Sequence, residues 1–453
     1  MATHQHTVYE RARLARDARF DGQFFIGVRT TGIYCRPICP ANSPKSENVT
    51  FFPSAAAASE AGYRPCLRCR PETAPGSPAW SGTSTTVRRG LRLIAAGALD
   101  DGNVEALSDR LGVTSRHLRR LFAQHLGASP LAVAHTQRLH FAKRLIDETR
   151  MPMGDISIAA GYGSVRRFND AFRKSYGRSP RELRRFTDGD DPDASATLTV
   201  RLPYRQPFDW LHATSFFAAR ATPGVESAEG DCYRRSVVID GEPGALEVRP
   251  ASKAGFLSLT LIGVRTTSIF EVVQRARDLF DLDAPVGEIA RVLRADPKLK
   301  AALKTLPGVR VPGAWDGFEL TVRAILGQQV SVAAATTLAG RIAGRYGTPL
   351  VLENDRSVPG VTTVFPSPER LARARFNNIG LVKTRAETIR TLSRKVISGE
   401  ISFDLSQDVD EFRERLCAIK GIGDWTAQYV AMRALKNPDA FPASDLGRRT
   451  RPT

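Results

Sequence analysis

The residues of this sequence that are best suited to chemistry are four cysteines near its start. Cys35 and Cys39 are separated by three residues, and Cys66 and Cys69 are separated by two. Thiolates bind zinc at such spacings, and the segment between the two pairs is long enough to form a small sheet. Four thiolates complete a tetrahedral Zn²⁺ site and leave no coordination position open for water or substrate. By ligand count alone, the predicted zinc site is therefore structural.

The residues around the cysteines change this interpretation. The first pair lies in VRTTGIYCRPIC, residues 28–39, and the second pair lies in GYRPCLRC, residues 62–69. Over about residues 8–74 the sequence closely resembles the zinc domain of Ada-type DNA repair proteins. The resemblance implies that the first thiolate, Cys35, also accepts a methyl group from a methylated phosphotriester of the DNA backbone. The chemistry is reasonable, because zinc keeps the thiols deprotonated and four thiolates on one divalent ion retain net negative charge.

Methylation of a thiolate removes part of that negative charge. We therefore expect the methylated domain to bind DNA more tightly, so that repair also signals damage. Guanidinium and hydroxyl groups near the cysteines suit the flanking phosphates, although the alternative for each arginine is a solvated side chain. The candidate phosphate contacts are Thr30, Thr31, Arg36, Arg64 and Arg68.

A helical pattern begins after a linker rich in Pro, Gly, Ser and Thr. Residues 103–122 carry apolar side chains at helical spacing on both sides of a Gly-Val-Thr turn, and Thr114 or Ser115 is placed to cap the second helix. Residues 153–172 repeat this arrangement, and a long basic helix around residues 131–149 joins the two units. The pattern predicts two helix-turn-helix units.

Together with the closing Gly-Arg-Ser-Pro at residues 177–180, the two units resemble the AraC-type DNA-binding domain over about residues 85–187. The resemblance implies that the second helix of each unit enters the major groove. A bundle with a solvated basic face is the alternative. The implied DNA contacts are Ser115, Arg116, Arg119 and Arg120 in the first unit, and Ser164, Arg166, Arg167 and Asn169 in the second.

The second half of the sequence begins with strand-like runs and continues with helices. The runs at residues 197–202, 235–239, 245–249 and 256–262 predict a small antiparallel sheet. Helical periodicity returns from residue 267. The other two cysteines are interpreted as ordinary buried thiols; they are Cys232 and Cys417.

A second chemical site is predicted close to the end of the sequence. Gly421 and Gly423 permit a tight helix-hairpin-helix turn, whose amides can meet a DNA phosphate and whose carbonyls can hold a monovalent or divalent cation. Asp445 follows about twenty residues later. From about residue 198 the sequence resembles AlkA-type 3-methyladenine DNA glycosylase II. The resemblance implies that Asp445 is the catalytic carboxylate, stabilising positive charge on the sugar and orienting water.

The same resemblance assigns further residues. Trp425 and Tyr429 match aromatic positions of the base pocket, where they would stack on a flipped base, although aromatic residues four apart on a helix are more often core. Gln329 lies where the family places a side chain that fills the gap in the duplex. The family continues for several helical turns beyond the aspartate, whereas this sequence has eight more residues. We therefore expect an incomplete glycosylase domain, which leaves its excision activity open.

Composition sets the broad class of partner. The 453 residues include 65 Lys and Arg against 47 Asp and Glu, giving a formal net charge of +18. This excess favours double-stranded DNA as partner, alkylated or promoter DNA, while a basic but non-binding surface is the alternative. There is no signal peptide and no apolar run of membrane-spanning length, so we expect no membrane association and a cytoplasmic location. An activator would also have RNA polymerase as a candidate partner.

The sequence thus predicts a multidomain α+β protein for repair of, and response to, DNA alkylation. Its activities would be a single-turnover methyl transfer to Cys35, transcriptional activation, and excision of alkylated purines such as 3-methyladenine. No Pro-Cys-His-Arg sequence is present, so repair of O6-alkylguanine is not predicted. The rival is a DNA-binding regulator with structural zinc and a vestigial glycosylase region. The predicted boundaries are a small α/β zinc domain at 1–74, a linker at 75–86, an all-α helix-turn-helix domain at 87–187, a linker at 188–196, a sheet domain at 197–283 and an all-α helix-hairpin-helix domain at 284–453.

Overall fold

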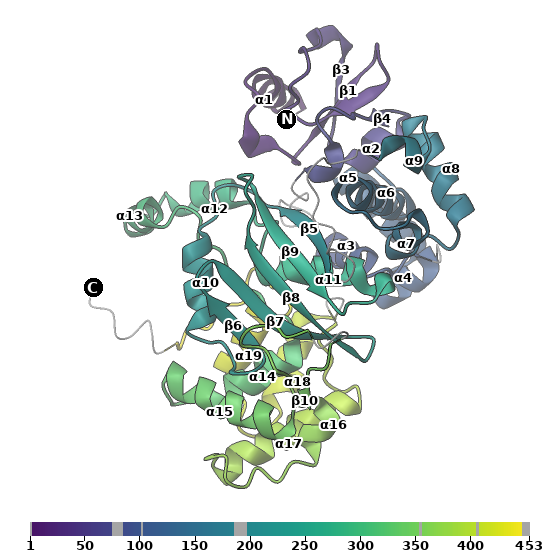
Figure 1. The fold of residues 1–453 in the computed structure, drawn as a ribbon. Helices are drawn as coiled ribbons and strands as arrows, with labels where there is room; N and C mark the ends of the chain where they lie inside the picture. The colour runs from purple at the N-terminus through teal and green to yellow at the C-terminus, as the bar shows by residue number, and fades with distance from the viewer. Residues whose placement is uncertain are drawn as a thin grey trace.

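The computed structural model describes residues 2–74, 85–100, 103–184, 197–352, 356–404 and 407–445. Most of the first predicted linker, all of the second and the basic residues 446–453 lie outside these ranges. Figure 1 shows the N-terminal region at the top beside a group of helices, a large sheet in the middle and a second group of helices below. Within the described ranges, no helix combines the length and apolar character needed to cross a membrane.

The N-terminal region is a four-stranded sheet with helices packed against it. The strand order is β3-β1-β2-β4, in which β4 runs parallel to β2 and the other pairs are antiparallel. Phe24 and Ile26 are buried, and the partly buried ring of Tyr9 stacks on Phe24 with the ring centroids 4.1 Å apart. The elements are α1 (Ala2–Leu14), η1 (Ala18–Phe20), β1 (Phe25–Val28), β2 (Ile33–Cys35), η2 (Ser46–Asn48), β3 (Val49–Phe52), α2 (Ala55–Glu60), β4 (Arg64–Pro65) and η3 (Pro71–Thr73).

The next region contains the two helix-turn-helix units that the sequence predicts. Thr114 caps α5 by accepting a hydrogen bond from His117, and Ser164 caps α8 in the same way. Both helices end at a glycine in the left-handed conformation, Gly127 and Gly177. The repeated capping fixes the length of both second helices. The elements are α3 (Thr85–Ala95), α4 (Val104–Arg110), α5 (Ser115–Leu126), α6 (Pro130–Glu148), α7 (Met153–Ala159), α8 (Val165–Tyr176) and α9 (Pro180–Leu183).

A five-stranded antiparallel sheet follows, with strand order β5-β9-β8-β7-β6. Alternate residues point to its buried face, among them Leu202, Leu246 and Leu259. The predicted strands are confirmed, whereas helix α10 and strand β6 were not predicted. The elements are β5 (Thr197–Pro203), α10 (Trp210–Ala218), β6 (Glu226–Glu229), β7 (Cys232–Ile239), β8 (Glu242–Pro250) and β9 (Phe256–Ile262).

The second helix-turn-helix unit and this sheet share one hydrophobic core. Buried residues of α6 to α9 belong to the same cluster as buried residues of the sheet and of α11. The rings of Phe141 and Phe270 meet at 4.7 Å, and the Glu148 carboxylate accepts a hydrogen bond of 3.0 Å from the Arg201 amide. Helix α7 also contacts η4 (Thr266–Ser268), the turn from which α11 begins. The two regions are therefore packed together and not merely joined by a linker.

The helices from α14 onward form a separate core around Phe318, Ile342, Ile389, Leu416 and Val430. Helices α14, α17, α18 and α19 meet in this core, and α18 and α19 form the predicted helix-hairpin-helix. The elements are η4 (Thr266–Ser268), α11 (Ile269–Leu279), α12 (Val286–Leu293), α13 (Pro297–Thr305), α14 (Gly317–Leu326), α15 (Val332–Tyr346), β10 (Thr348–Pro349), β11 (Thr363–Val364), α16 (Pro368–Ala372), α17 (Lys383–Ile397), α18 (Val409–Cys417) and α19 (Asp424–Arg433).

Candidate functional site

The four N-terminal cysteines form one cluster, in which all Sγ atoms lie within 4.8 Å of one another. Parallel pairing of β2 with β4 places Tyr34 beside Pro65, so the residues that follow them, Cys35 and Cys66, become neighbours. A tetrahedral zinc site with Zn–S bonds of about 2.3 Å requires sulfurs roughly 3.8 Å apart. The cluster therefore fits one zinc ion held by four thiolates.

The four sulfurs differ in their surroundings. Cys66 and Cys69 are buried, whereas Cys35 and Cys39 are partly exposed. The Arg36 amide donates to the sulfur of Cys69 at 3.4 Å, the Cys69 amide donates to Cys66, and the Ala41 amide donates to Cys39. Because such a hydrogen bond withdraws negative charge from a thiolate, it lowers the nucleophilicity of the sulfur that accepts it. The partly exposed sulfurs of Cys35 and Cys39 are the two that a substrate can reach.

The crowding of the thiols also indicates that a cation is needed. A hydrogen bond from Cys35 lowers the pKa of Cys39 to about 7, and hydrogen bonds to Cys39 and Cys66 raise the pKa of Cys35. Hydrogen bonds to neighbouring sulfurs likewise raise the pKa of Cys69. The protein alone thus keeps part of the cluster protonated. A bound zinc ion would remove these protons, because its charge keeps each coordinating thiol deprotonated.

The residues of this domain that were predicted to contact phosphates lie on its surface, with one exception. Thr30 and Thr31 are exposed in the turn between β1 and β2, and Arg64 and Arg68 are exposed on either side of Cys66. Arg36 is the exception. It is buried, which contradicts its prediction as a DNA contact.

The predicted major-groove residues lie on the exposed sides of α5 and α8. Arg116, Arg119 and Arg120 are exposed, although Arg119 also pairs with Glu105 at 3.2 Å. Ser115 and Asn169 are half-buried, while Ser164, Arg166 and Arg167 are exposed, and the Ser164 hydroxyl accepts the capping hydrogen bond of α8. Both second helices thus present basic residues to solvent.

The second candidate site lies at the start of α19. The indole Nε1 of Trp425 donates to Oδ2 of Asp445 at 3.0 Å, which fixes the carboxylate beside the aromatic ring. The rings of Trp425 and Tyr429 are stacked, with centroids 5.2 Å apart and planes 11° apart. The amide side chain of Gln428, between them on the helix, accepts from the Phe441 amide at 3.0 Å and so holds the loop that carries Asp445. The structure therefore brings the predicted aspartate and both aromatic residues together.

An arginine that the sequence did not predict as a site residue packs against one of these two rings. Arg433 lies over the rings of Tyr429 and Phe216, at 5.2 Å and 5.0 Å from their centroids, and donates to the Tyr429 hydroxyl. Burial alone would raise the pKa of this hydroxyl, but the positive charge of Arg433 lowers it below its ordinary value. Because Phe216 belongs to α10, which the sequence did not reveal, only the spacing of Arg433 from Tyr429 on α19 could have suggested the contact.

The predicted DNA-facing glycines and Gln329 lie on neighbouring loops. Gly421 has φ +95° and is exposed, as are Gly423 and Gln329. The carbonyls of Lys420 and Gly421 already accept hydrogen bonds from Thr388 and Gln328, at 2.8 Å and 3.0 Å. A carbonyl oxygen has two lone pairs, so each keeps one for the predicted cation, which stays a prediction.

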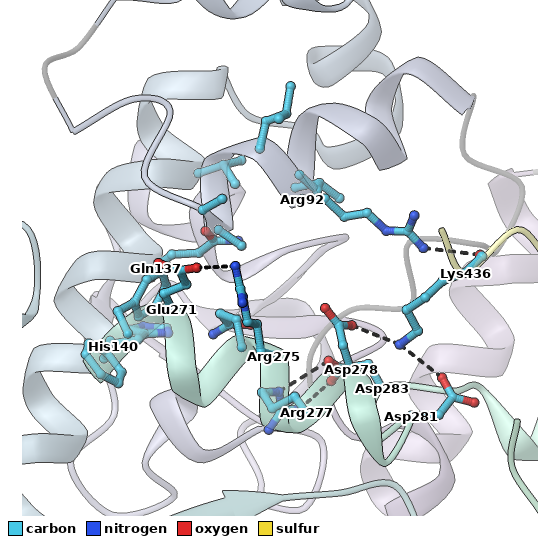
Figure 2. Close-up of a pocket in the computed structure, with 18 of the residues that line it drawn as sticks. Arg92, Gln137, His140, Glu271, Arg275, Arg277, Asp278, Asp281, Asp283 and Lys436 are labelled. Carbon is cyan, nitrogen blue, oxygen red and sulfur yellow. Dashed lines mark hydrogen bonds and ion pairs between the residues drawn. The ribbon is translucent and has the colours of Figure 1, made fainter. Parts of the chain in front are cut away.

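A cavity of about 610 Å³ lies between the domains, and Figure 2 shows the charged residues around it. These residues pair with one another: Lys436 bridges Asp278 at 2.8 Å and Asp281 at 3.4 Å, and Arg277 pairs with Asp283. Arg92 on α3 reaches across to the Leu435 carbonyl at 2.7 Å. The charged residues that line the cavity thus connect neighbouring domains of the protein.

Comparison with known family models finds a match in four successive parts of the chain. Family models match residues 9–72 as the metal binding domain of Ada, 107–185 as a helix-turn-helix domain, 199–316 as the AlkA N-terminal domain and 322–450 as a HhH-GPD superfamily base excision DNA repair protein. The probable bifunctional transcriptional activator/DNA repair enzyme AlkA of Mycobacterium tuberculosis is 42% identical over 442 residues, 97% of this chain and 88% of the relative. The chain belongs to this Ada–AlkA family of bifunctional proteins.

Two further relatives each match one part of the Ada–AlkA chain. DNA-3-methyladenine glycosylase 2 of Escherichia coli is 33% identical over 247 residues, 54% of this chain and 83% of the relative. The bifunctional transcriptional activator/DNA repair enzyme AdaA of Bacillus subtilis is 32% identical over 178 residues, 39% of this chain and 81% of the relative. The predicted fusion and the four-cysteine zinc site are confirmed.

Arg36 of the Ada–AlkA protein does not face DNA, which corrects its predicted role. Its Nε donates to Oδ1 of Asp21 at 2.8 Å, and its Nη1 donates to the Thr73 hydroxyl at 2.8 Å and to the Cys69 carbonyl at 3.1 Å. The side chain is 11% exposed. With these partners the guanidinium stabilises the loop that holds the metal ligands. If it turned towards DNA, the Asp21 carboxylate would be left buried without an ion-pair partner.

Arg36→Met is therefore expected to destabilise the zinc region by about 3 kcal/mol, because it leaves the Asp21 carboxylate buried without its partner. Hydrogen exchange of the β1 and β2 segments would measure the local free energy of opening. Arg68→Met is the matched control, since Arg68 is exposed and its loss should change stability by less than about 0.5 kcal/mol. Equal exchange in the two variants would contradict the bracing role.

A second buried network joins the zinc region to α6. The Tyr34 hydroxyl, next to Cys35, shares a hydrogen bond of 2.9 Å with Nε2 of His140. Arg70, next to Cys69, pairs with Asp147 at 2.7 Å and with Glu72 at 3.1 Å. The residues beside two metal ligands are thus tied to the helix that connects the two helix-turn-helix units.

The buried His140 predicts a loss of stability in acid. Burial, and then the neighbouring His135 and Arg144, lower the pKa of His140 to about 4, whereas an unfolded histidine titrates near 6.5. Between these values only the unfolded chain binds the proton, so stability is full above about pH 6.5 and falls by about 3 kcal/mol as the pH approaches 4. Thermal unfolding against pH should be less steep for His140→Gln; identical slopes would count against this origin.

Proposed function

We propose that this protein removes methyl groups and alkylated bases from double-stranded DNA and activates transcription in response to the damage. The observation that carries the proposal is the difference between the four thiols. Cys35 is one of the two that are partly exposed, and it belongs to the part of the chain that matches the metal binding domain of Ada. A purely structural zinc site has no need for an exposed sulfur.

The methyl transfer follows from this arrangement. Zinc held by Cys35, Cys39, Cys66 and Cys69 would keep all four thiols deprotonated. The Cys35 sulfur attacks the methyl carbon of a phosphotriester, an S–C bond forms, and the C–O bond to the phosphate breaks. The phosphate keeps the electron pair and returns to an ordinary charged diester. Because the resulting thioether is not cleaved again, each protein molecule acts once.

The transfer also supplies the signal. It removes one negative charge from the zinc cluster, so repulsion between this face and the DNA phosphates falls. Exposed Thr30, Thr31, Arg64 and Arg68 around the cluster are the proposed phosphate contacts. The basic residues on α5 and α8 are the proposed contacts to promoter DNA. We extend the proposal to RNA polymerase as the partner of the bound activator and to a cytoplasmic location.

Base excision is proposed for the site on α19. A flipped, electron-poor base would stack on Trp425 and Tyr429. The C1′–N bond breaks, its electron pair neutralises the cationic alkylated base, and positive charge is left on the sugar. The Asp445 carboxylate stabilises this charge and takes the proton of the water that adds to C1′. The hydrogen bond from Trp425 holds the carboxylate in place for both tasks.

The test is the mass of the protein and of its peptides after incubation with DNA that carries methylphosphotriesters. One added methyl group on the peptide that contains Cys35 is expected. The same zinc-loaded protein on unmethylated DNA is the control. No uptake by zinc-loaded protein that still binds DNA would support the rival function, a regulator with structural zinc and a vestigial glycosylase region.

A further inference from the structure

Gln328 links two loops that both face DNA in the proposed excision site. Its Nε2 donates to the Gly421 carbonyl at 3.0 Å and to the Thr426 hydroxyl at 3.1 Å. Gln328 thereby joins the loop between α14 and α15, which carries Gln329, to the hairpin turn between α18 and α19. These two loops are more than ninety residues apart in the sequence.

Helix α17 holds the same two loops from behind. Nη2 of Arg385 donates to the Gln328 carbonyl at 2.7 Å, and the Thr388 hydroxyl donates to the Lys420 carbonyl at 2.8 Å, or to the Thr384 carbonyl at 3.1 Å. Arg385 and Thr388 are three residues apart and so lie on one side of the helix. A single rigid element thus sets the positions of both loops.

The close approach at Thr388 explains why the turn needs a glycine. A Cβ atom at Gly421 would lie 2.4 Å from the Thr388 hydroxyl oxygen, and the residue has φ +95°. Space and backbone conformation therefore both exclude a side chain. The contact between α17 and the hairpin turn therefore depends on both Thr388 and Gly421.

The loop that Gln328 anchors is strained. Gln329 has φ +57°, a conformation that costs a side-chain-bearing residue energy and persists only where the surroundings enforce it. Gln329 is exposed, and Val330 beside it is 38% exposed, so the loop presents both to solvent. The hydrogen bonds at Gln328 supply the constraint that keeps Gln329 in this outward position.

We propose that Gln328, Arg385 and Thr388 are positioning residues for base flipping, which hold Gln329 at a fixed distance from the hairpin turn. With this spacing fixed, the turn that binds a phosphate also places Gln329 at the gap which the flipped nucleotide leaves. These residues act on the opening of the duplex and not on the chemistry in the pocket. This inference rests on the proposed base excision.

The experiment compares two duplexes that carry one 7-methylguanine, either paired with cytosine or placed in a single-nucleotide bulge. The bulged base is already unpaired, so excising it requires less of the flipping machinery. Gln328→Met and Thr388→Val are expected to lower the single-turnover rate of base release from the paired duplex by about tenfold, the weight of one or two hydrogen bonds. The rate from the bulged duplex should change by less than about twofold.

Three controls make the result decisive. Thr391→Val removes a hydroxyl one turn further along α17 that contacts Glu387 and Arg394 of the same helix and neither of the two loops, and should match the unmodified protein. Thr388→Ser keeps the hydroxyl and should restore the rate, and thermal unfolding shows whether each variant is folded. Unchanged release from the paired duplex, or equal losses on both duplexes, would overturn the positioning role. If the unmodified protein releases base from neither duplex, the proposed excision itself fails.

Discussion

Asp445→Asn is expected to lower the single-turnover rate of base excision by about 100-fold or more, while binding to DNA with an abasic site is retained. The substitution removes the negative charge that stabilises the positive sugar. It preserves the geometry, because the amide oxygen of the new side chain can still accept from the Trp425 indole, as the carboxylate does at 3.0 Å. The loss should therefore appear in the rate of bond cleavage and not in binding.

Gln428→Glu offers a comparison on the same helix, because a carboxylate can also accept from the Phe441 amide. It should keep most of the activity, since the loop that carries Asp445 remains attached. If Asp445→Asn excised alkylated purines at the unmodified rate, another group would have to carry the charge stabilisation.

Cys35→Ala is expected to abolish methyl uptake from methylphosphotriester DNA, because the three sulfurs that remain are either buried or receive backbone hydrogen bonds. Quantitative mass spectrometry of the protein after incubation with excess DNA would measure the loss. Zinc content is measured in parallel, since three thiolates can still hold the ion with a water in the fourth position.

Cys39→Ala is the matched control for this experiment. It also removes one ligand, and one from the partly exposed pair, so both variants lose zinc affinity for the same reason. We expect Cys39→Ala to retain methyl uptake at Cys35 in proportion to the zinc it binds. Uptake by Cys35→Ala at the same zinc content would assign the chemistry to another sulfur.

The sequence was sufficient wherever local patterns decide the structure. The two helix-turn-helix units were predicted because apolar spacing, cap residues and glycine ends agree, and the structure chose Thr114 over Ser115 as the cap. The cysteine cluster was predicted because cysteines separated by two or three residues in the chain are typical zinc ligands. These signals extend over a few residues and survive without knowledge of the fold.

The residues that were misassigned or missed depend on contacts between distant segments. Arg36 looked like a phosphate ligand, but its guanidinium meets Asp21 in a loop that only the folded domain brings to it. Gln328 looked like a neighbour of Gln329 and nothing more, until α17 and the hairpin turn were placed around it. An arginine or an amide has the same letter in the sequence whether it faces DNA or closes a loop.

The core shared by the second helix-turn-helix unit and the five-stranded sheet keeps these two regions from moving relative to each other. Interfaces between domains are commonly polar and allow the domains to move relative to each other, whereas here Phe141 is buried in one apolar cluster and the ring of Phe270 packs against it. When α8 lies in a major groove, the direction in which the sheet and its attached helices extend from that DNA is therefore already set.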